Sequence, residues 1–178
     1  MLEESITVFD AFECWLYTGT LKDPPSDLTT ATKENEYLEA IELCRIWVFA
    51  DMRGIPGLAN TAIDMYQERI VATWATNSAV LDYIYQSTTP GSKLRKFIVD
   101  EFTKTMDANS FMIAMTPDNS PTEFLLEAIP PLMEFFWDRT TYCLKDWTCV
   151  DRCEWHDHSG PGGKLRHELR KRGFGVLA

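Results

Sequence analysis

A glycine and a proline separated by one residue divide the first half of this chain into two helices. Gly54 follows one amphipathic stretch, and Pro56 opens the next, with Ile55 between them. Glycine enters the left-handed conformation that ends a helix without steric cost. Proline is tolerated at the first helical position because its missing N–H would be unpaired there. So short a link predicts an antiparallel hairpin, with a helix over 34–53 followed by a helix over 56–73.

The apolar residues of both hairpin helices recur at helical spacing, which indicates one buried face on each. The buried face predicted for the first helix consists of Leu38, Ile41, Trp47, Val48 and Met52. Its water-facing side consists of Glu36, Glu39, Glu42 and Arg45. The inward residues predicted for the second helix are Leu58, Ala59, Ala62, Ile63, Tyr66 and Ile70. The two small alanines would let the helix axes approach closely.

A further helix is predicted before the hairpin, from an N-cap at Ser5 to Thr18, where Gly19 stops it. Its predicted buried face consists of Val8, Phe9, Phe12, Trp15 and Leu16. We expect one short strand at 20–21. Residues 22–33 contain consecutive prolines and three threonines, so we expect a surface loop there.

Cap and break residues predict more helices after the hairpin. Asn77 or Ser78 caps a short helix that carries Val80, Leu81, Ile84 and Tyr85. Pro90-Gly91 breaks the chain, and Ser92 caps a helix that carries Leu94, Phe97, Ile98 and Phe102.

The run 120–123, Ser-Pro-Thr-Glu, is a strong helix start, because it combines a serine N-cap, a proline at the first position and a glutamate that completes a capping box. We expect Pro130-Pro131 to interrupt this helix and a second piece to restart with Leu132, Phe135, Phe136 and Trp137. The predicted fold class is therefore mainly α. The predicted regions are 1–74, a helical extension over 75–142, and a tail over 143–178.

Two stretches carry a family resemblance. Residues 9–21 read FDAFECWLYTGTL, and residues 49–64 read FADMRGIPGLANTAID. In order and spacing they resemble the second half of a BTB/POZ domain of the type common in filamentous fungi, with its "F…WLYTG.L" helix and "AD…GIP.L…AID" hairpin. The matching residues are Phe12, Trp15, Leu16, Tyr17, Thr18, Gly19, Leu21, Ala50, Asp51, Gly54, Ile55, Pro56, Leu58, Ala62, Ile63 and Asp64. The resemblance continues weakly through 83–100.

The resemblance implies a helical remnant of the α/β BTB/POZ fold, consisting of a helix, a short strand and a helical hairpin. Additional helices and a tail that contains cysteine and histidine follow it. The family's opening strands and first helices precede the matched part, so the N-terminal part of the domain is expected to be missing. Their absence would leave an apolar patch, and we expect the chain to self-associate. Asp51 and Asp64 match family positions and are expected to help fix the hairpin.

The function implied by the resemblance is non-catalytic protein–protein interaction. BTB/POZ domains dimerise and present surfaces to protein partners, sometimes a cullin ubiquitin-ligase scaffold and sometimes transcriptional co-regulators. The chain is accordingly expected to be an adaptor or oligomerisation module and not an enzyme. The implied contact regions are the 19–33 loop and the 34–73 hairpin. No Walker-type loop, nucleophile elbow or His-Glu-x-x-His helix is present in the sequence.

Charge and cysteine content narrow the partners and the compartment. A net charge of −10 disfavours nucleic acid and anionic membranes as partners. No apolar segment approaches the roughly 20 residues that span a bilayer. An odd count of 5 cysteines without a signal peptide indicates reduced thiols inside the cell, in the cytoplasm, the nucleus or both. The basic run at 164–172 is either a solvated tail or a nuclear-localisation or acid-binding patch.

The tail also concentrates residues that bind metals. The candidate ligands are Cys143, Cys149, Cys153, His156 and His158. Tetrahedral zinc prefers sulfur and nitrogen donors, and Cys149 and Cys153 would share one face of a helix. The alternative function is therefore a small zinc-stabilised regulatory protein. The competing interpretation is that these are ordinary side chains of a terminal turn, with no cofactor. Cys14 and Cys44, on apolar helical faces, are expected to behave as small hydrophobes.

Overall fold

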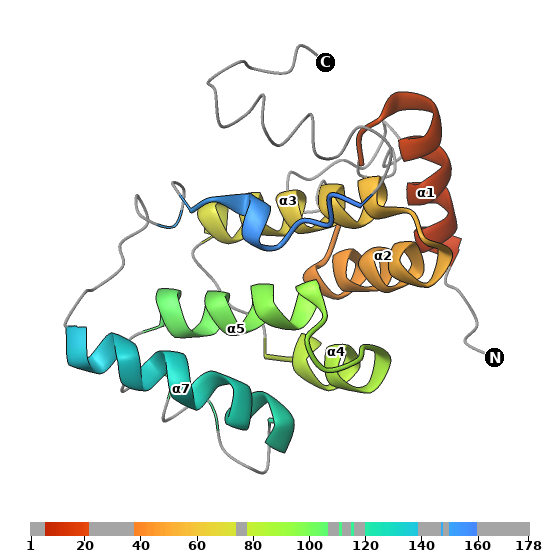
Figure 1. The fold of residues 1–178 in the computed structure, drawn as a ribbon. Coiled ribbons are helices and arrows are strands. Elements are labelled where there is room, and N and C mark those ends of the chain that lie inside the picture. Colours follow the sequence, from red (N-terminus) through yellow and green to blue (C-terminus); the bar gives the residue numbers. More distant parts are fainter. Residues whose placement is uncertain are drawn as a thin grey trace. The chain divides into compact units, whose positions relative to one another are not determined.

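The computed structural model describes residues 6–21, 38–73, 78–106, 111, 115, 120–138, 147 and 150–159. It is mainly helical, as the sequence predicts, and the described ranges contain no strand. The elements in order are α1 (Ile6–Thr18), α2 (Ala40–Arg53), α3 (Pro56–Thr73), α4 (Val80–Ser87), α5 (Lys93–Thr105), α7 (Thr122–Asp138) and the 3-10 helix η2 (Arg152–Glu154) (Figure 1). None of these described helices is long and apolar enough to cross a membrane.

The chain forms two compact units. Unit 1 comprises Met1–Asp64 and Arg152–Ala178, and unit 2 comprises Met65–Asp151. Helix α3 therefore contributes its first half to unit 1 and its second half to unit 2. The predicted region boundaries at 74/75 and 142/143 lie outside the described residues.

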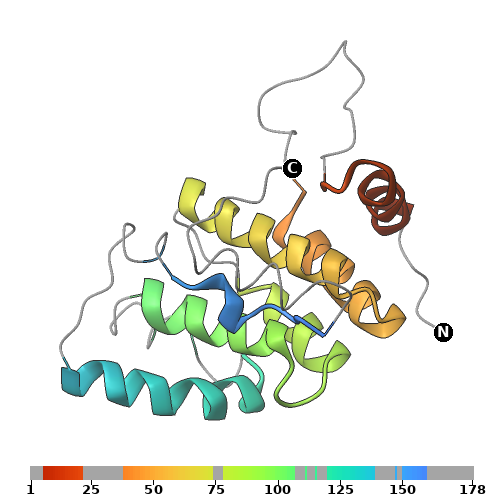
Figure 2. The same ribbon diagram turned by 45° about the horizontal axis from the view of Figure 1, so that its top comes forward.

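The hairpin between α2 and α3 is confirmed. Gly54 ends α2 in the left-handed conformation, at φ 65°, and the Ile55 amide donates to the Ala50 carbonyl at 2.9 Å. The Ile55 carbonyl then accepts the amides of Leu58 and Ala59, so α3 begins at once with Pro56. The first half of α3 runs back along α2 (Figures 1 and 2). Local backbone chemistry at three residues therefore sets the chain reversal.

The hairpin core follows the predicted pattern in α3 and departs from it in α2. The six inward residues predicted for α3 are all buried. Helix α2 begins at Ala40, because Leu38 and Glu39 precede it in non-helical conformation, and 34–37 lie outside the described residues. Met52, predicted to be buried, is 65% exposed. Leu43, Cys44 and Ile46, which the prediction did not include, are buried instead.

Helix α1 buries only part of the predicted face. It ends at Thr18 before Gly19, which has φ 71°, as expected. Its buried residues are Val8 and Ala11, whereas Phe9 is 54% exposed and Leu16 is 59% exposed. Phe12 and Trp15 are half-buried, and the Phe12 ring lies 5.3 Å from the Phe49 ring. The residues 8, 11, 12 and 15 make a second helical stripe that overlaps the predicted one, and the small Ala11 lets α1 approach α2 along it.

The short strand expected at 20–21 is not formed. The Thr20 amide donates to Oγ1 of Thr18 at 3.2 Å, and its carbonyl lies 3.0 Å from the same oxygen. The backbone of Thr20 is thus engaged by a neighbouring side chain in a local turn, of the kind that threonine favours. Leu21 is buried without belonging to a sheet.

Unit 2 is built around an aromatic core. Phe97 of α5 lies 5.3 Å from the ring of Tyr66 and 6.2 Å from that of Trp147. Phe102 of α5 lies 5.4 Å from Phe124 of α7. The cap at Ser92 is confirmed by its bond from the Arg95 amide, whereas the N-cap of α4 is Ala79 instead of Ser78. Asn77 lies outside the described residues.

A buried arginine ties α4, α5 and α7 together within this unit. Arg95 is 5% exposed and donates to the carbonyls of Tyr85 and Thr88 at 3.0 and 2.6 Å. Its guanidinium lies 4.2 Å from the centre of the Tyr85 ring, and the Tyr85 hydroxyl donates to Glu127 at 2.6 Å. Burial, together with the Glu127 carboxylate, raises the pKa of Tyr85, so this hydroxyl stays protonated as a donor.

Helix α7 continues through the proline pair that was expected to interrupt it. Pro130 and Pro131 lie inside a single helix. They remove the amides that would bond to the carbonyls of Leu126 and Glu127. Leu126 and Pro130 are on an exposed side, so water can solvate a freed carbonyl there. The predicted cap at Ser120 is not formed, since no amide of the described residues donates to its hydroxyl, which itself donates to the Met115 sulfur at 3.2 Å. The side chains of Phe135, Phe136 and Trp137 lie outside the description.

Replacing Gly57 with Ala tests the contact between α1 and the start of α3. The added Cβ would lie 3.1 Å from Cζ2 of Trp15, which is too close for a relaxed contact. Gly→Ala in an open helix stabilises by about 0.5–1 kcal/mol, and we expect this gain to be lost here. In a Trp15→Leu background the gain should reappear. Chemical denaturation of the wild type, the two single variants and the double variant measures the coupling free energy between positions 15 and 57. Additive changes in the free energy of unfolding would contradict the contact.

Replacing Glu101 with Met tests a buried carboxyl in unit 2. Glu101 is fully buried, and neither carboxyl oxygen has a hydrogen-bond partner among the described residues. Burial raises the pKa of Glu101 well above its unfolded value of 4.5. The part of the folding free energy that depends on a protonated Glu101 is therefore fully present below pH 4.5. It is lost as the pH rises toward the folded-state pKa of this carboxyl.

We expect Glu101→Met to stabilise the protein by on the order of 1–3 kcal/mol at neutral pH and to flatten the decline with pH. Thermal unfolding followed by circular dichroism over a pH series measures both effects. The matched control is Glu134→Gln, at an exposed position of α7. Equal pH profiles for wild type and Glu101→Met would show that the Glu101 carboxyl does not cause the decline of stability with pH.

Candidate functional site

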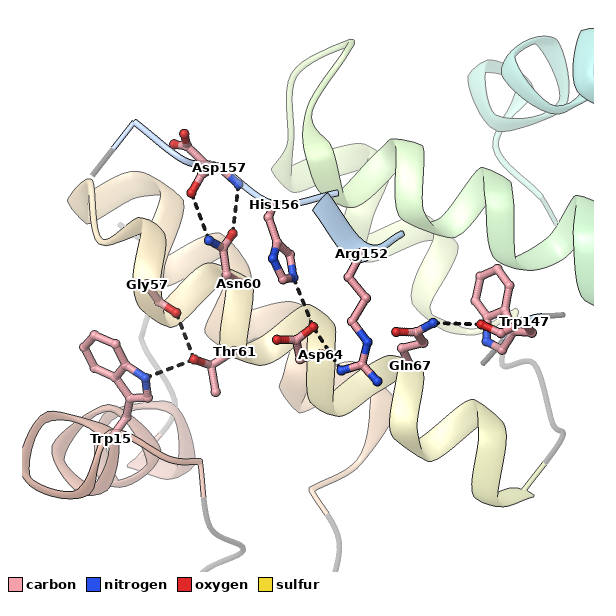
Figure 3. Close-up of polar contacts among 10 residues, drawn as sticks. All are labelled: Trp15, Gly57, Asn60, Thr61, Asp64, Gln67, Trp147, Arg152, His156 and Asp157. Atoms are coloured by element: carbon pink, nitrogen blue, oxygen red, sulfur yellow. Dashed lines mark hydrogen bonds and ion pairs between the residues drawn. The ribbon is translucent and has the colours of Figure 1, made fainter. Parts of the chain in front are cut away.

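A row of polar side chains on α3 binds a segment distant in sequence. Asn60 and Asp64 lie one turn apart on the helix and both contact residues 152–157 within unit 1 (Figure 3). We call residues Arg152–Ser159 the C-terminal strap. Gln67, the next residue of the row, lies in unit 2 and donates to the Trp147 carbonyl at 3.0 Å. The helix thus uses one polar face for recognition of backbone and side chains.

Asn60 holds the backbone of the strap at two points. Its Nδ2 donates to the Asp157 carbonyl at 2.9 Å, and its Oδ1 accepts the Asp157 amide at 2.9 Å. A side-chain amide that bonds both the N–H and the C=O of one residue imitates a neighbouring strand. The contact therefore fixes the position of the backbone and is indifferent to the side chain at 157.

Asp64 holds the strap through two side chains. Its Oδ1 lies 3.1 Å from an Arg152 guanidinium nitrogen and 3.0 Å from Nε2 of His156. Burial alone would raise the pKa of Asp64, but the hydrogen bond and charge of His156, together with Arg152, outweigh it and lower this pKa. The carboxylate therefore stays ionised and anchors both groups.

The strap is packed as well as hydrogen-bonded. Trp155 is fully buried, and His156 is 4% exposed. Helix η2 turns the chain so that the Trp155 amide donates to the Arg152 carbonyl at 3.0 Å. Because of this turn, Arg152 and His156 reach the same carboxylate from the same side of α3 (Figure 3). An indole of this size contributes more burial than any other strap residue.

Helix α1 contacts the beginning of α3 in the same unit. Nε1 of Trp15 donates to the Thr61 hydroxyl at 3.1 Å, and that hydroxyl donates to the Gly57 carbonyl at 2.9 Å. The absence of a side chain at Gly57 leaves room for the indole. Trp15 and Thr61 therefore set the distance between α1 and α3.

The candidate zinc ligands are only partly within the description. Cys143 and Cys149 lie outside it. Cys153 is half-buried on η2, and the rings of His156 and His158 lie 5.8 Å apart. The Nε2 atom of His156 is engaged by Asp64. Within the described ranges, no three His, Cys, Asp or Glu side chains are placed to hold a metal ion.

Sequence reasoning missed the pairing of α3 with the strap. It singled out Asp64 and expected it to fix the hairpin, but the hydrogen-bond partners of this carboxylate are Arg152 and His156. Asn60 and Arg152 received no role at all. The available signal was the spacing of Asn60, Asp64 and Gln67, which places three polar groups along one face of a helix whose other face is apolar.

This arrangement is suited to binding a peptide segment. An Asp–His pair also occurs in acid–base sites, but there a ring nitrogen must reach a substrate, and here the His156 ring is almost wholly buried. Backbone pairing by Asn60, an ion pair and a buried indole are instead the elements of peptide recognition. No family model, curated protein or solved structure matches the chain.

Replacing Asp64 with Asn tests the strap anchor. Because the pKa of Asp64 is below its unfolded value of 3.8, its contribution is present above that pH and is lost as pH falls through the folded-state pKa. The variant should lose about 1–2 kcal/mol at neutral pH and should be less sensitive to acid.

Hydrogen exchange of the Asp157 amide reports the strap directly, since that amide is bonded to Asn60. We expect faster exchange in Asp64→Asn and no change in the control Asp10→Asn, an exposed carboxylate of α1. Unchanged protection at Asp157 in the Asp64 variant would mean that the ion pair does not hold the strap.

Proposed function

We propose that this protein is a non-catalytic protein–protein interaction module of BTB/POZ type, which acts as an adaptor or oligomerisation domain. The motif residues at 12–21 and 50–64 support this proposal. So does the order of the described elements, since helix α1 precedes a tight hairpin of α2 and α3. The proposed setting is the cytoplasm or nucleus, and a cullin ubiquitin-ligase scaffold or a transcriptional co-regulator is a partner of the kind that the resemblance implies.

The observation that carries the proposal is the exposed apolar face of α1. Ile6 is 81% exposed, Phe9 54%, Leu16 59% and Tyr17 80%. At 100° per residue these four side chains lie on one side of the helix. The opposite side, with Val8 and Ala11, packs within unit 1. Helix α1 thus packs within unit 1 by one face, and its other face is exposed and apolar.

An apolar face of this kind is typical of an interaction surface. Burying exposed apolar area gains roughly 25 cal/mol per Å2, and contiguous exposed apolar patches mark binding sites. Two aromatic rings, Phe9 and Tyr17, are among the residue types that anchor protein interfaces. Asp10 and Glu13 on the same helix disfavour an anionic membrane as the partner. The face is therefore best suited to another protein, with a second copy of this chain as the first partner to test.

The double variant Phe9→Ser/Leu16→Ser tests this proposal in the full chain. Analytical ultracentrifugation should show wild-type self-association, and the variant should weaken it at least tenfold. Both positions are exposed, so the helical circular-dichroism spectrum should not change. The matched control is Leu126→Ser/Met133→Ser, which removes exposed apolar side chains from α7. A wild-type chain that stays monomeric up to about 100 μM, or a variant that associates equally well, would contradict the proposed surface.

A further inference from the structure

Helix α7 carries a second exposed apolar surface, in unit 2. Leu126 is 65% exposed, Ile129 48% and Met133 54%, and Pro130 is exposed between them. We call these four residues the α7 stripe. Their spacing of three and four residues places them on one side of the helix. The opposite side is the one that packs, through the buried Phe124, Ala128 and Leu132.

The charged residues of α7 itself all have one sign. Helix α7 contains Glu123, Glu127, Glu134 and Asp138 and no lysine, arginine or histidine. Glu123 lies one turn before Leu126, and Glu134 lies one turn after Pro130, and both side chains are exposed. Glu127 is already engaged by Tyr85 and Arg95. Glu123 and Glu134 therefore remain as a pair of carboxylates along one edge of the stripe.

The proline pair adds hydrogen-bond acceptors to the same surface. In a regular helix the carbonyls of Leu126 and Glu127 would accept the amides of residues 130 and 131. Both of those residues are prolines, so neither carbonyl receives its usual helical donor. The surface thus combines apolar side chains, negative charge and backbone acceptors. A complementary partner must supply apolar area together with positively charged donors.

We propose that the α7 stripe is a docking site for a basic amphipathic segment of another protein. The apolar face of that segment covers Leu126, Ile129 and Met133, and its lysines or arginines pair with Glu123 and Glu134. A second copy of α7 is a poor occupant, because it would set acidic edges against each other. This site lies in unit 2 and does not depend on the surface proposed for α1.

The test measures binding of the full chain to two labelled peptides. Both are amphipathic helices of about 18 residues with leucines on one face; one has lysine at its polar positions and the other has glutamate. By fluorescence anisotropy the lysine peptide should bind with a Kd of roughly 10–100 μM, and the glutamate peptide at least tenfold more weakly. Binding of the lysine peptide should weaken as salt screens the ion pairs.

Three variants locate the binding. Leu126→Ser/Met133→Ser should weaken the lysine peptide at least tenfold, and Glu123→Gln/Glu134→Gln should weaken it and reduce the salt dependence. The matched control, Met52→Ser, removes an exposed apolar side chain of α2 that belongs to neither proposed surface, and it should leave binding unchanged. Loss of binding in the Met52 control, or equal binding by wild type and the Leu126/Met133 variant, would overturn the proposal. So would self-association that the Leu126/Met133 variant abolishes, since a second copy would then be the occupant.

Discussion

The tight turn at Gly54–Pro56 is the constraint on which the rest of unit 1 depends. It reverses the chain within three residues by a left-handed glycine and a proline that starts the next helix. Because the start of α3 is thereby fixed against α2, Gly57 and Thr61 come into position for Trp15 of α1. The same helix then presents Asn60 and Asp64 to the strap.

Three helices of this protein pack by one face and use another face for different contacts. Helix α3 uses one face for the apolar core and another for backbone pairing and an ion pair. Helices α1 and α7 each pack by one face and expose large apolar side chains on the other. The two exposed surfaces differ in their chemistry: the surface of α1 contains aromatic rings, whereas that of α7 contains carboxylates and backbone acceptors beside its apolar side chains. Both features agree with the proposed role as a protein–protein interaction module.

The helix ends could be predicted because the signals for them are local. The features that were predicted wrongly depend on contacts between residues far apart in the sequence. Gly19, Gly54, Pro56 and Ser92 act on their own neighbours, so the ends that they set agree with the structure. The buried face of α1 was predicted only in part, because two apolar stripes overlap on this helix and only the packing partner selects one. The proline pair in α7 was predicted to interrupt this helix, but the helix is continuous and packs against α5 within unit 2. The polar row on α3 is visible in the sequence, but its partner is not, since Asp64 bonds to Arg152 and His156, which lie 88 and 92 positions further along the chain.

The central claim is that α1 binds a protein through its exposed apolar face. Site-specific photo-crosslinking in the source cell tests it most directly, with a benzophenone amino acid in place of Phe9 or Leu16 and with Asp82 of α4 as the exposed control site. The account predicts discrete protein adducts, which include a second copy of the chain, from both α1 positions and not from position 82. Adducts that are absent at both α1 positions, or identical at all three sites, would contradict it.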